Sequence, residues 1–182
     1  MSNKIYSIVD TETTGLNPRW GRVIDIAVVS VKEGKVINKY ETLVNPGQNI
    51  SKFISSYTGI NNKLVKKAPE FIDISYNLKD LLDNTIVIAH NAMFDISFLK
   101  NEFKRVNLDW HTEYMCTINL CRKLYPTIKK RDLDTLAKNF NVKIENRHRA
   151  LGDALATARI FTKMYIENNP IWEYTHQLLK RV

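Results

Sequence analysis

Residues 5–15 have the sequence IYSIVDTETTG, in which an apolar run is followed directly by two acids and a glycine. The run Ile5–Val9 is short and rich in β-branched residues, which predicts a buried strand. Side chains two apart on a strand point to the same face, so Asp10 and Glu12 are expected to lie together at its end. Two adjacent carboxylates on a buried strand carry a severe electrostatic penalty unless cations neutralise them. The stretch therefore indicates a cation site at the end of a strand.

The pattern of apolar residues along the rest of the chain predicts an α/β fold, with a mixed sheet covered by helices. A β-hairpin is indicated by Glu33-Gly34 between two strand-like runs, since glycine accepts a turn conformation that other residues resist. A helix is indicated after Asp132, a suitable N-terminal cap. The expected strands are 5–9, 22–31, 35–44, 85–89 and 114–117, and the main expected helices are 70–83, 132–140, 149–167 and 171–180.

The composition fits one globular domain with a polyanionic partner. The 182 residues are 44% hydrophobic and 25% charged, enough to bury a sizeable core. The formal net charge is +8, with 27 Lys and Arg against 19 Asp and Glu. Such a positive balance suits a nucleic-acid partner, because contacts to phosphates supply most of the sequence-independent affinity of a protein for nucleic acid. The same charge also fits an ordinary solvated surface, so charge alone does not decide the partner.

The chain is expected to be soluble and cytoplasmic. Its two cysteines, Cys116 and Cys121, lack the spacing of a zinc site and fit a reducing compartment. Residues 1–5 lack the apolar run of a signal peptide, and no apolar stretch approaches the length of a membrane span. No association with a membrane is therefore expected.

Two later segments place further acids near the predicted ends of strands or helices. Asp95 begins a helix just past the strand 85–89. His148 and Asp153 are five residues apart, which on a continuous helix turns them about 140° from each other. Both reach one site most easily if His148 lies on the loop before the helix and Asp153 lies in its first turns. Taken singly, each of these residues also fits a cap, an exposed loop or a packing position.

Four segments together carry a family resemblance. They are DTETTGL at 10–16, HNAMFD at 90–95, LDTLA at 133–137 and HRALGDALATA at 148–158. In order, separation and flanking residues they resemble the DnaQ-like branch of the DEDD 3′→5′ exonucleases, in the subgroup with a histidine in the last motif, similar to the proofreading exonucleases of bacterial DNA polymerase III. The resemblance covers about residues 4–165. It implies a ribonuclease H-like fold with a five-stranded mixed sheet flanked by helices, an exonuclease domain over 1–168 and a helical tail over 169–182.

The resemblance also implies a catalytic site. The ligands of two divalent metal ions, Mg²⁺ or Mn²⁺, would be Asp10, Glu12, Asp95 and Asp153. Hard cations of this kind prefer oxygen donors and complete their coordination with substrate phosphate. His148 would accept the proton of the attacking water. The products would be a nucleoside 5′-monophosphate and a strand shortened at its 3′ end.

By the same resemblance, three segments would hold the terminal nucleotide. They are Thr13, Thr14, Gly15 and Leu16 after the first strand, the segment 57–60 with Tyr57, Thr58 and Ile60 opposite them, and His90, Asn91 and Phe94 below. An apolar wedge and an aromatic floor suit unstacked single-stranded ends, since every base has a face to stack. Core packing is the alternative for Leu16, Ile60 and Phe94. Related exonucleases often have a histidine where Thr58 stands, and this sequence departs from them there.

These observations favour a 3′→5′ exonuclease of the proofreading or repair type that acts on single-stranded DNA ends, with DNA polymerase subunits as candidate partners. Trimming of RNA 3′ ends is the enzymatic alternative, because the contact to a 2′-hydroxyl cannot be assigned from one sequence. A metal-free nucleic-acid-binding module is the alternative of a different class, and the intact acid set with His148 argues against it. Whether the chain is free-standing or part of a longer protein stays open.

Overall fold

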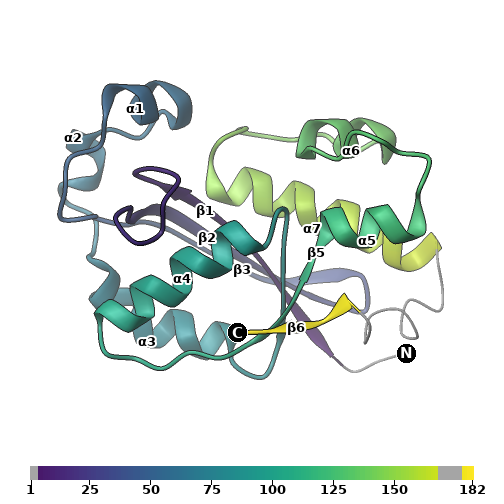
Figure 1. Ribbon diagram of the computed structural model, residues 1–182, viewed down its shortest axis with the longest axis horizontal. Helices are drawn as coiled ribbons and strands as arrows, with labels where there is room; N and C mark the ends of the chain where they lie inside the picture. The colour runs from purple at the N-terminus through teal and green to yellow at the C-terminus, as the bar shows by residue number, and fades with distance from the viewer. Residues whose placement is uncertain (1–3, 168–177) are drawn as a thin grey trace.

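The computed structural model describes residues 4–167 and 178–182, which form a mixed sheet between two layers of helices (Figure 1). The sheet has six strands in the order β3-β2-β1-β4-β5-β6. The strands are β1 Ile5–Thr13, β2 Val23–Lys32, β3 Lys35–Leu43, β4 Ile86–Ala89, β5 Glu113–Cys116 and β6 Lys180–Arg181. β1 pairs with β2 in antiparallel and with β4 in parallel orientation, and β4 pairs with β5 in parallel. The α/β fold expected from the sequence is confirmed.

Helices cover both faces of the sheet. In the described part of the chain they are α1 Lys52–Thr58, α2 Asn62–Val65, α3 Phe71–Leu82, α4 Met93–Arg105, α5 Thr117–Leu124, α6 Leu133–Asn139 and α7 Ala150–Glu167. One face packs on α3 and α4, and the other packs on α5, α6 and α7. None of the helices in the described ranges is long and apolar enough to cross a membrane.

The central strands are buried on both faces, which explains their nearly continuous apolar sequences. Ile8 and its parallel partner Ile88 lie in the core formed with α5, α6 and α7. Val9 and Val87 lie in the core formed with α3 and α4. Successive residues of a strand alternate between its faces. The even-numbered residues of β1 therefore face α7, and the odd-numbered ones face α4.

The hairpin between β2 and β3 turns through the predicted dipeptide. Glu33 and Gly34 both have positive φ, 51° and 77°. Two successive positive φ values define the two-residue turn whose twist matches that of the paired strands. The first three strands therefore form a meander along the chain, as their sequences predict.

The expected count of five strands is wrong, because a sixth strand is present. β6 pairs antiparallel with β5, with Tyr114 opposite Lys180 and Glu113 opposite Arg181. The helix expected over 171–180 falls mostly outside the described residues, and its last residue belongs to β6. A two-residue strand has no periodicity of apolar side chains, so its sequence carries no signal for pairing.

Candidate active site

The acids singled out in the sequence converge at the carboxyl ends of the parallel strands β1 and β4, where open α/β sheets bind their ligands. Asp10 and Glu12 belong to β1, Asp95 lies in the first turn of α4, and Asp153 lies in the first turn of α7. All four acids and His148 line one cavity of about 720 Å³. Segments separated by more than a hundred residues thus supply one acidic site.

The alternation of β1 determines which helix each acid meets. Asp10 and Glu12 follow Ile8 on the face that packs on α7, the helix of Asp153. Thr11 lies on the opposite face, and its N–H and hydroxyl both donate to Asp95 Oδ1, at 3.0 and 2.8 Å. Thr11, between the two acids of β1, therefore holds the carboxylate of Asp95 on α4 in position.

His148 lies on the loop before α7, as the spacing to Asp153 predicts. Its backbone has a φ of 62°, and its N–H donates to Asp153 Oδ2 at 3.4 Å. The loop passes close to the first turn of α7, where a Cβ added to Gly152 would lie 2.5 Å from the carbonyl oxygen of Asn146. Real Cβ atoms do not approach that closely, so Gly152 allows the loop to bring His148 beside the acids.

The donor set fits a divalent metal ion. One ligand atom from each of Glu12, His148 and Asp153 lies within 4.8 Å of the other two. Asp153 Oδ1 is buried and has no hydrogen-bond partner among the described residues. A buried carboxylate oxygen without a donor is destabilising, and a hard cation is the partner that carboxylate oxygens bind best. Glu12 and Asp153, with Asp10 beside them on β1, are the residues suited to hold such an ion.

Without a cation, burial favours the protonated forms of the acids. Burial, and then the charges of Asp95, Asp153 and Glu12, raise the pKa of Asp10 well above its ordinary value. Burial and the charge of Asp153 raise the pKa of Glu12 to about 8. Burial raises the pKa of Asp95 to about 7, although the hydrogen bonds from Thr11 act in the opposite direction. Divalent cations would favour the charged forms and so reverse these shifts.

Arg147 supplies a positive charge at the edge of the cluster. Its guanidinium pairs with Asp153 Oδ2 and, at 3.1 Å, with Asp134 Oδ1. Its charge opposes the rise in the pKa of both Asp10 and Glu12. No motif assigned Arg147 to the site, and its position next to His148 in the sequence was the available signal.

The cavity contains two histidines with different environments. Burial, and then the charge of Arg147, lowers the pKa of His90 to about 4, and its Nδ1 lies 2.9 Å from Thr117 Oγ1. His90 is therefore a neutral hydrogen-bonding residue at physiological pH. His148 lies with the acids, and its ring packs on that of Tyr57 with centroids 4.0 Å apart. His148 is the histidine placed to exchange a proton beside the carboxylates.

Most of the residues expected to bind the terminal nucleotide line the cavity, and two do not. Those that line it are Thr13, Gly15, Leu16, Thr58, His90, Asn91 and Phe94. The hydroxyl of Thr14 points elsewhere and accepts from the backbone N–H of Arg22 at 2.9 Å. Ile60 is 1% exposed and packs with Ile24 and Val65 in a small separate core. Thr14 and Ile60 therefore do not line the cavity, and their expected contacts to the nucleotide stay predictions.

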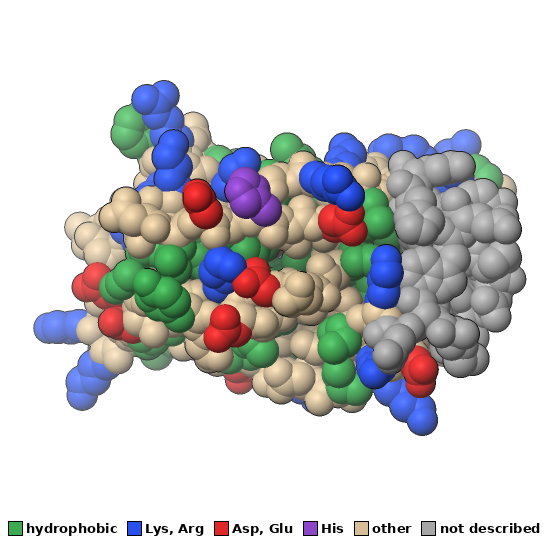
Figure 2. Space-filling view, turned by 90° about the horizontal axis from the view of Figure 1, so that it is seen from below, with side chains coloured by type: hydrophobic (Ala, Val, Ile, Leu, Met, Phe, Trp, Pro, Cys, Tyr) green, Lys and Arg blue, Asp and Glu red, His purple; other side chains and the backbone are tan. Residues whose placement is uncertain are grey.

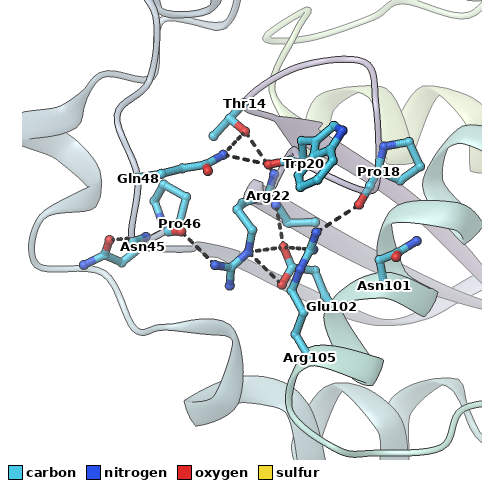
Figure 3. A network of polar contacts seen from close by, with 12 residues as sticks. Thr14, Pro18, Trp20, Arg22, Asn45, Pro46, Gln48, Asn101, Glu102 and Arg105 are labelled. Carbon is cyan, nitrogen blue, oxygen red and sulfur yellow. Dashed lines mark hydrogen bonds and ion pairs between the residues drawn. The ribbon is translucent and has the colours of Figure 1, made fainter.

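A polar network holds the loop between β1 and β2, from Thr14 to Arg22, against α4 (Figure 3). The side chain of Glu102, 1% exposed, accepts from Arg22 Nε at 2.9 Å and from the N–H of Val23 at 3.0 Å. Arg105 pairs with Glu102 at 3.4 Å and donates to the carbonyl oxygens of Pro18 and Arg19. The network supports the loop that carries Gly15 and Leu16 into the cavity.

The cavity also contains residues that no sequence pattern assigned to the site. They are Thr11, Ile54, Ile118, Arg131, Asp132, Leu133 and Arg147. Tyr57, in the expected segment 57–60, also lines the cavity. Leu133 opens the LDTLA motif, so that motif gave a partial signal. Ile118 and Arg131 lie outside the four motifs, and only the tertiary fold brings them in.

Comparisons with known proteins agree with this geometry. The RNase_T family model, described as "Exonuclease", matches residues 7–161. A "DNA polymerase III PolC-type" of Caldanaerobacter subterraneus subsp. tengcongensis is 40% identical over 159 residues, which are 87% of this chain and 11% of that protein. The PolC-type polymerase of Bacillus subtilis is 35% identical over 167 residues, 90% of this chain and 12% of that protein. The chain thus spans only about a tenth of the length of these curated relatives.

Solved structures of exonucleases share the fold. Exonuclease X, solved in complex with 5′ overhanging duplex DNA, is 30% identical with a TM-score of 0.73, over 90% of this chain and 92% of that one. The zinc-bound complex of E. coli exonuclease I with single-stranded DNA has a TM-score of 0.85 at 18% identity, over 97% of this chain and 43% of that one. The ribonuclease H-like fold is thereby confirmed. With its family model matched over residues 7–161 and its motifs gathered in one cavity, the chain belongs to the RNase T exonuclease family, in the DnaQ-like group that its sequence resembles.

Proposed function

We propose that the chain is a 3′→5′ exonuclease that hydrolyses single-stranded DNA ends with the help of two divalent metal ions, Mg²⁺ or Mn²⁺. The observation that carries the proposal is the convergence of four acids and His148 in one cavity, with a buried carboxylate oxygen left without a donor among the described residues. A cluster of this charge favours a phosphodiester only after cations neutralise it. The family to which the chain belongs supports the same chemistry.

The ions would be held by Asp10, Glu12, Asp95 and Asp153. When bound, they supply positive charge to the attacking and leaving oxygens of an in-line displacement at phosphorus. The protein would keep the carboxylates in place through the β1 backbone, the Thr11 hydrogen bonds and the first turn of α7. The rigidity of these elements suits a site that must not rearrange during the reaction.

His148 would act as the general base. Its ring would remove a proton from water as the water oxygen bonds to phosphorus, and the bond from phosphorus to the 3′ oxygen would break. The 3′ oxygen would take up a proton from solvent, which leaves a nucleoside 5′-monophosphate and a shortened strand. Burial, and then the charge of Arg147, holds the pKa of His148 below its ordinary value, so the ring is neutral and ready to accept a proton at neutral pH.

The shape of the cavity suits an unpaired strand end. Leu16 is 85% exposed at its rim, and Phe94 lies on its wall. An exposed apolar side chain can wedge against a base, and an aromatic ring can stack on one. We therefore propose Leu16, Phe94, Asn91 and Thr58 as contacts to the terminal nucleotide.

A replication setting is part of the proposal. The relatives named PolC-type DNA polymerase III and the exonuclease structures solved with DNA support a proofreading or repair role with polymerase subunits as partners. We further propose that residues 1–168 are the exonuclease domain.

The test is a hydrolysis assay with 5′-labelled single-stranded DNA and RNA of one sequence, in Mg²⁺, in Mn²⁺ and in EDTA. The expected result is a ladder of DNA products shortened from the 3′ end, dependent on metal and absent in EDTA. Faster shortening of RNA than of DNA would make RNA the proposed substrate in place of DNA. Nucleic-acid binding without hydrolysis in either metal would overturn the enzymatic proposal.

A further inference from the structure

The segment 51–67, called here the α1–α2 lobe, combines positive charge with exposed aromatic rings. Four lysines belong to it, namely Lys52, Lys63, Lys66 and Lys67, and all four are exposed. The segment contains no Asp or Glu. Acidic and basic side chains are interspersed on the face seen from below (Figure 2), whereas every charged residue of the lobe is a lysine.

Two aromatic rings lie one helical turn apart on α1. Phe53 is 76% exposed and Tyr57 is 54% exposed. Their ring centroids are 6.3 Å apart and their planes are within 8° of parallel. A phenylalanine that remains so exposed contributes little to folding, because its stabilising effect depends on removal from water.

The folding of the lobe does not require these rings. Its apolar side is covered by Ile60 and Val65, which pack with Ile24 and Ile50 in the small separate core. The same core accounts for the burial of Ile60, for which a substrate contact had been expected. Phe53 and Tyr57 are not members of that core, so their exposure leaves two aromatic faces available to a ligand.

The aromatic faces continue outward from the cavity. The ring of Tyr57 lines the cavity and packs on His148. Phe53 is the next ring along α1 and does not line the cavity. A strand whose last nucleotide occupies the acidic site would therefore pass Tyr57 first and Phe53 next.

We infer that the α1–α2 lobe binds the single strand beyond the two nucleotides at its 3′ end, with bases on the Phe53 ring and phosphates near the lysines. The inference rests on the proposed nuclease function and adds a subsite to it. Stacking of bases on aromatic rings and attraction of the backbone to lysines are the two interactions by which proteins hold single strands without reading their sequence.

The experiment compares Phe53→Ala with Phe53→Trp and with Tyr76→Ala, which removes a ring 65% exposed on α3. Hydrolysis of a dinucleotide and of a twelve-nucleotide strand is measured in Mn²⁺. Phe53→Ala should raise KM for the long strand about 5- to 100-fold, the range expected when one base loses its stacking partner, with kcat and the dinucleotide unchanged. Phe53→Trp should restore the KM, and Tyr76→Ala should leave it at the wild-type value.

Equal effects of Phe53→Ala on the two substrates, or no effect on either, would overturn the subsite and leave the nuclease proposal intact. Failure of the wild-type chain to hydrolyse either substrate would overturn the nuclease proposal and this inference with it.

The salt dependence of KM gives a second measurement. Changing Lys63 and Lys66 to Gln should flatten the dependence of long-strand KM on salt, whereas changing Lys35 and Lys39 of β3 to Gln should not. Equal slopes for the two double variants would count against the lysine contacts.

Discussion

Two groups of buried carboxylates in this molecule have opposite environments. Glu102 on α4 is enclosed by Arg22, Arg105 and the backbone N–H of Val23 (Figure 3). The acid cluster is defined as Asp10, Glu12, Asp95 and Asp153. Among the described residues, its one ion pair joins Asp153 and Arg147. The fold thus places two arginines around Glu102 and only Arg147 beside the four acids of the cluster.

This difference indicates a structural role for Glu102 and an environment suited to bound cations for the acid cluster. A buried charge is stable when hydrogen bonds and an opposite charge surround it, as at Glu102. In the acid cluster that compensation is incomplete and burial favours the protonated forms, as the pKa of about 8 for Glu12 indicates. Cations from solvent are the partners that would complete it.

Asp10→Asn should have the largest effect. Hydrolysis should fall by more than the roughly 10²–10⁴-fold expected for loss of a general base, because a proposed ligand of the metal ions is removed. The metal-free protein should at the same time unfold at a higher temperature at neutral pH, because Asn replaces an acid whose charged form the folded site disfavours. Activity assays and thermal unfolding in EDTA check both. A variant that is as active as wild type, or less stable, would contradict the comparison.

His148→Ala should reduce the rate by about 10²–10⁴-fold and leave the affinity for Mn²⁺ near the wild-type value. The wild-type rate should fall as the pH is lowered through the pKa of His148, since only the neutral ring accepts a proton, and the variant should lose this dependence. Calorimetric titration of Mn²⁺ and a pH–rate profile are the measurements. A large loss of Mn²⁺ affinity would instead make His148 a metal ligand, which its distance to Glu12 and Asp153 permits.

Glu102→Gln makes the same chemical change as Asp10→Asn, at the compensated acid. It should destabilise the protein by about 1–3 kcal/mol, because Arg22 and Arg105 lose the charge they surround. Urea unfolding in EDTA measures the change in the free energy of unfolding. An increase in the free energy of unfolding for Asp10→Asn and a decrease for Glu102→Gln would support the comparison. Changes in the same direction for both variants would contradict it.

The pH dependence of stability should be modest and should have a defined direction. The folded-state pKa values of about 8 for Glu12 and about 7 for Asp95 lie above the ordinary values of 4.5 and 3.8. The folded state therefore binds more protons between about pH 4 and 8, and stability is lost as the pH rises through this window. Thermal unfolding of the metal-free protein at pH 5 and pH 8 checks the sign, and Glu12→Gln should flatten the slope. Saturating Mn²⁺ should offset the loss at pH 8.

The sequence was sufficient where local chemistry determines the structure. Ile5–Val9 predicts β1 because its apolar residues need burial on both faces. Glu33-Gly34 predicts the turn because glycine accepts the positive φ that the turn requires. The position of His148 before α7 follows from helical geometry together with the expectation that His148 and Asp153 share one site. Each of these predictions depends on residues close together in the chain.

The features that the sequence did not reveal depend on tertiary contacts. β6 adds to the sheet through backbone pairing of two residues, Thr14 turns to Arg22 instead of the cavity, and Ile60 fills a small separate core. Arg147 meets Asp153 only once the loop folds back on α7. In an irregular loop, side-chain direction follows from packing, and no periodicity in the sequence records it.

Gly152 places a limit on how this protein can be engineered. Alanine in a helix interior is normally about 1 kcal/mol more favourable than glycine, so a glycine in a helix invites replacement. In the first turn of α7 the added methyl group would overlap the carbonyl oxygen of Asn146 and force the neighbouring loop outward. The gain in helix stability would be exchanged for a displaced His148, and attempts to make the protein more heat-resistant through α7 should begin beyond its first turn.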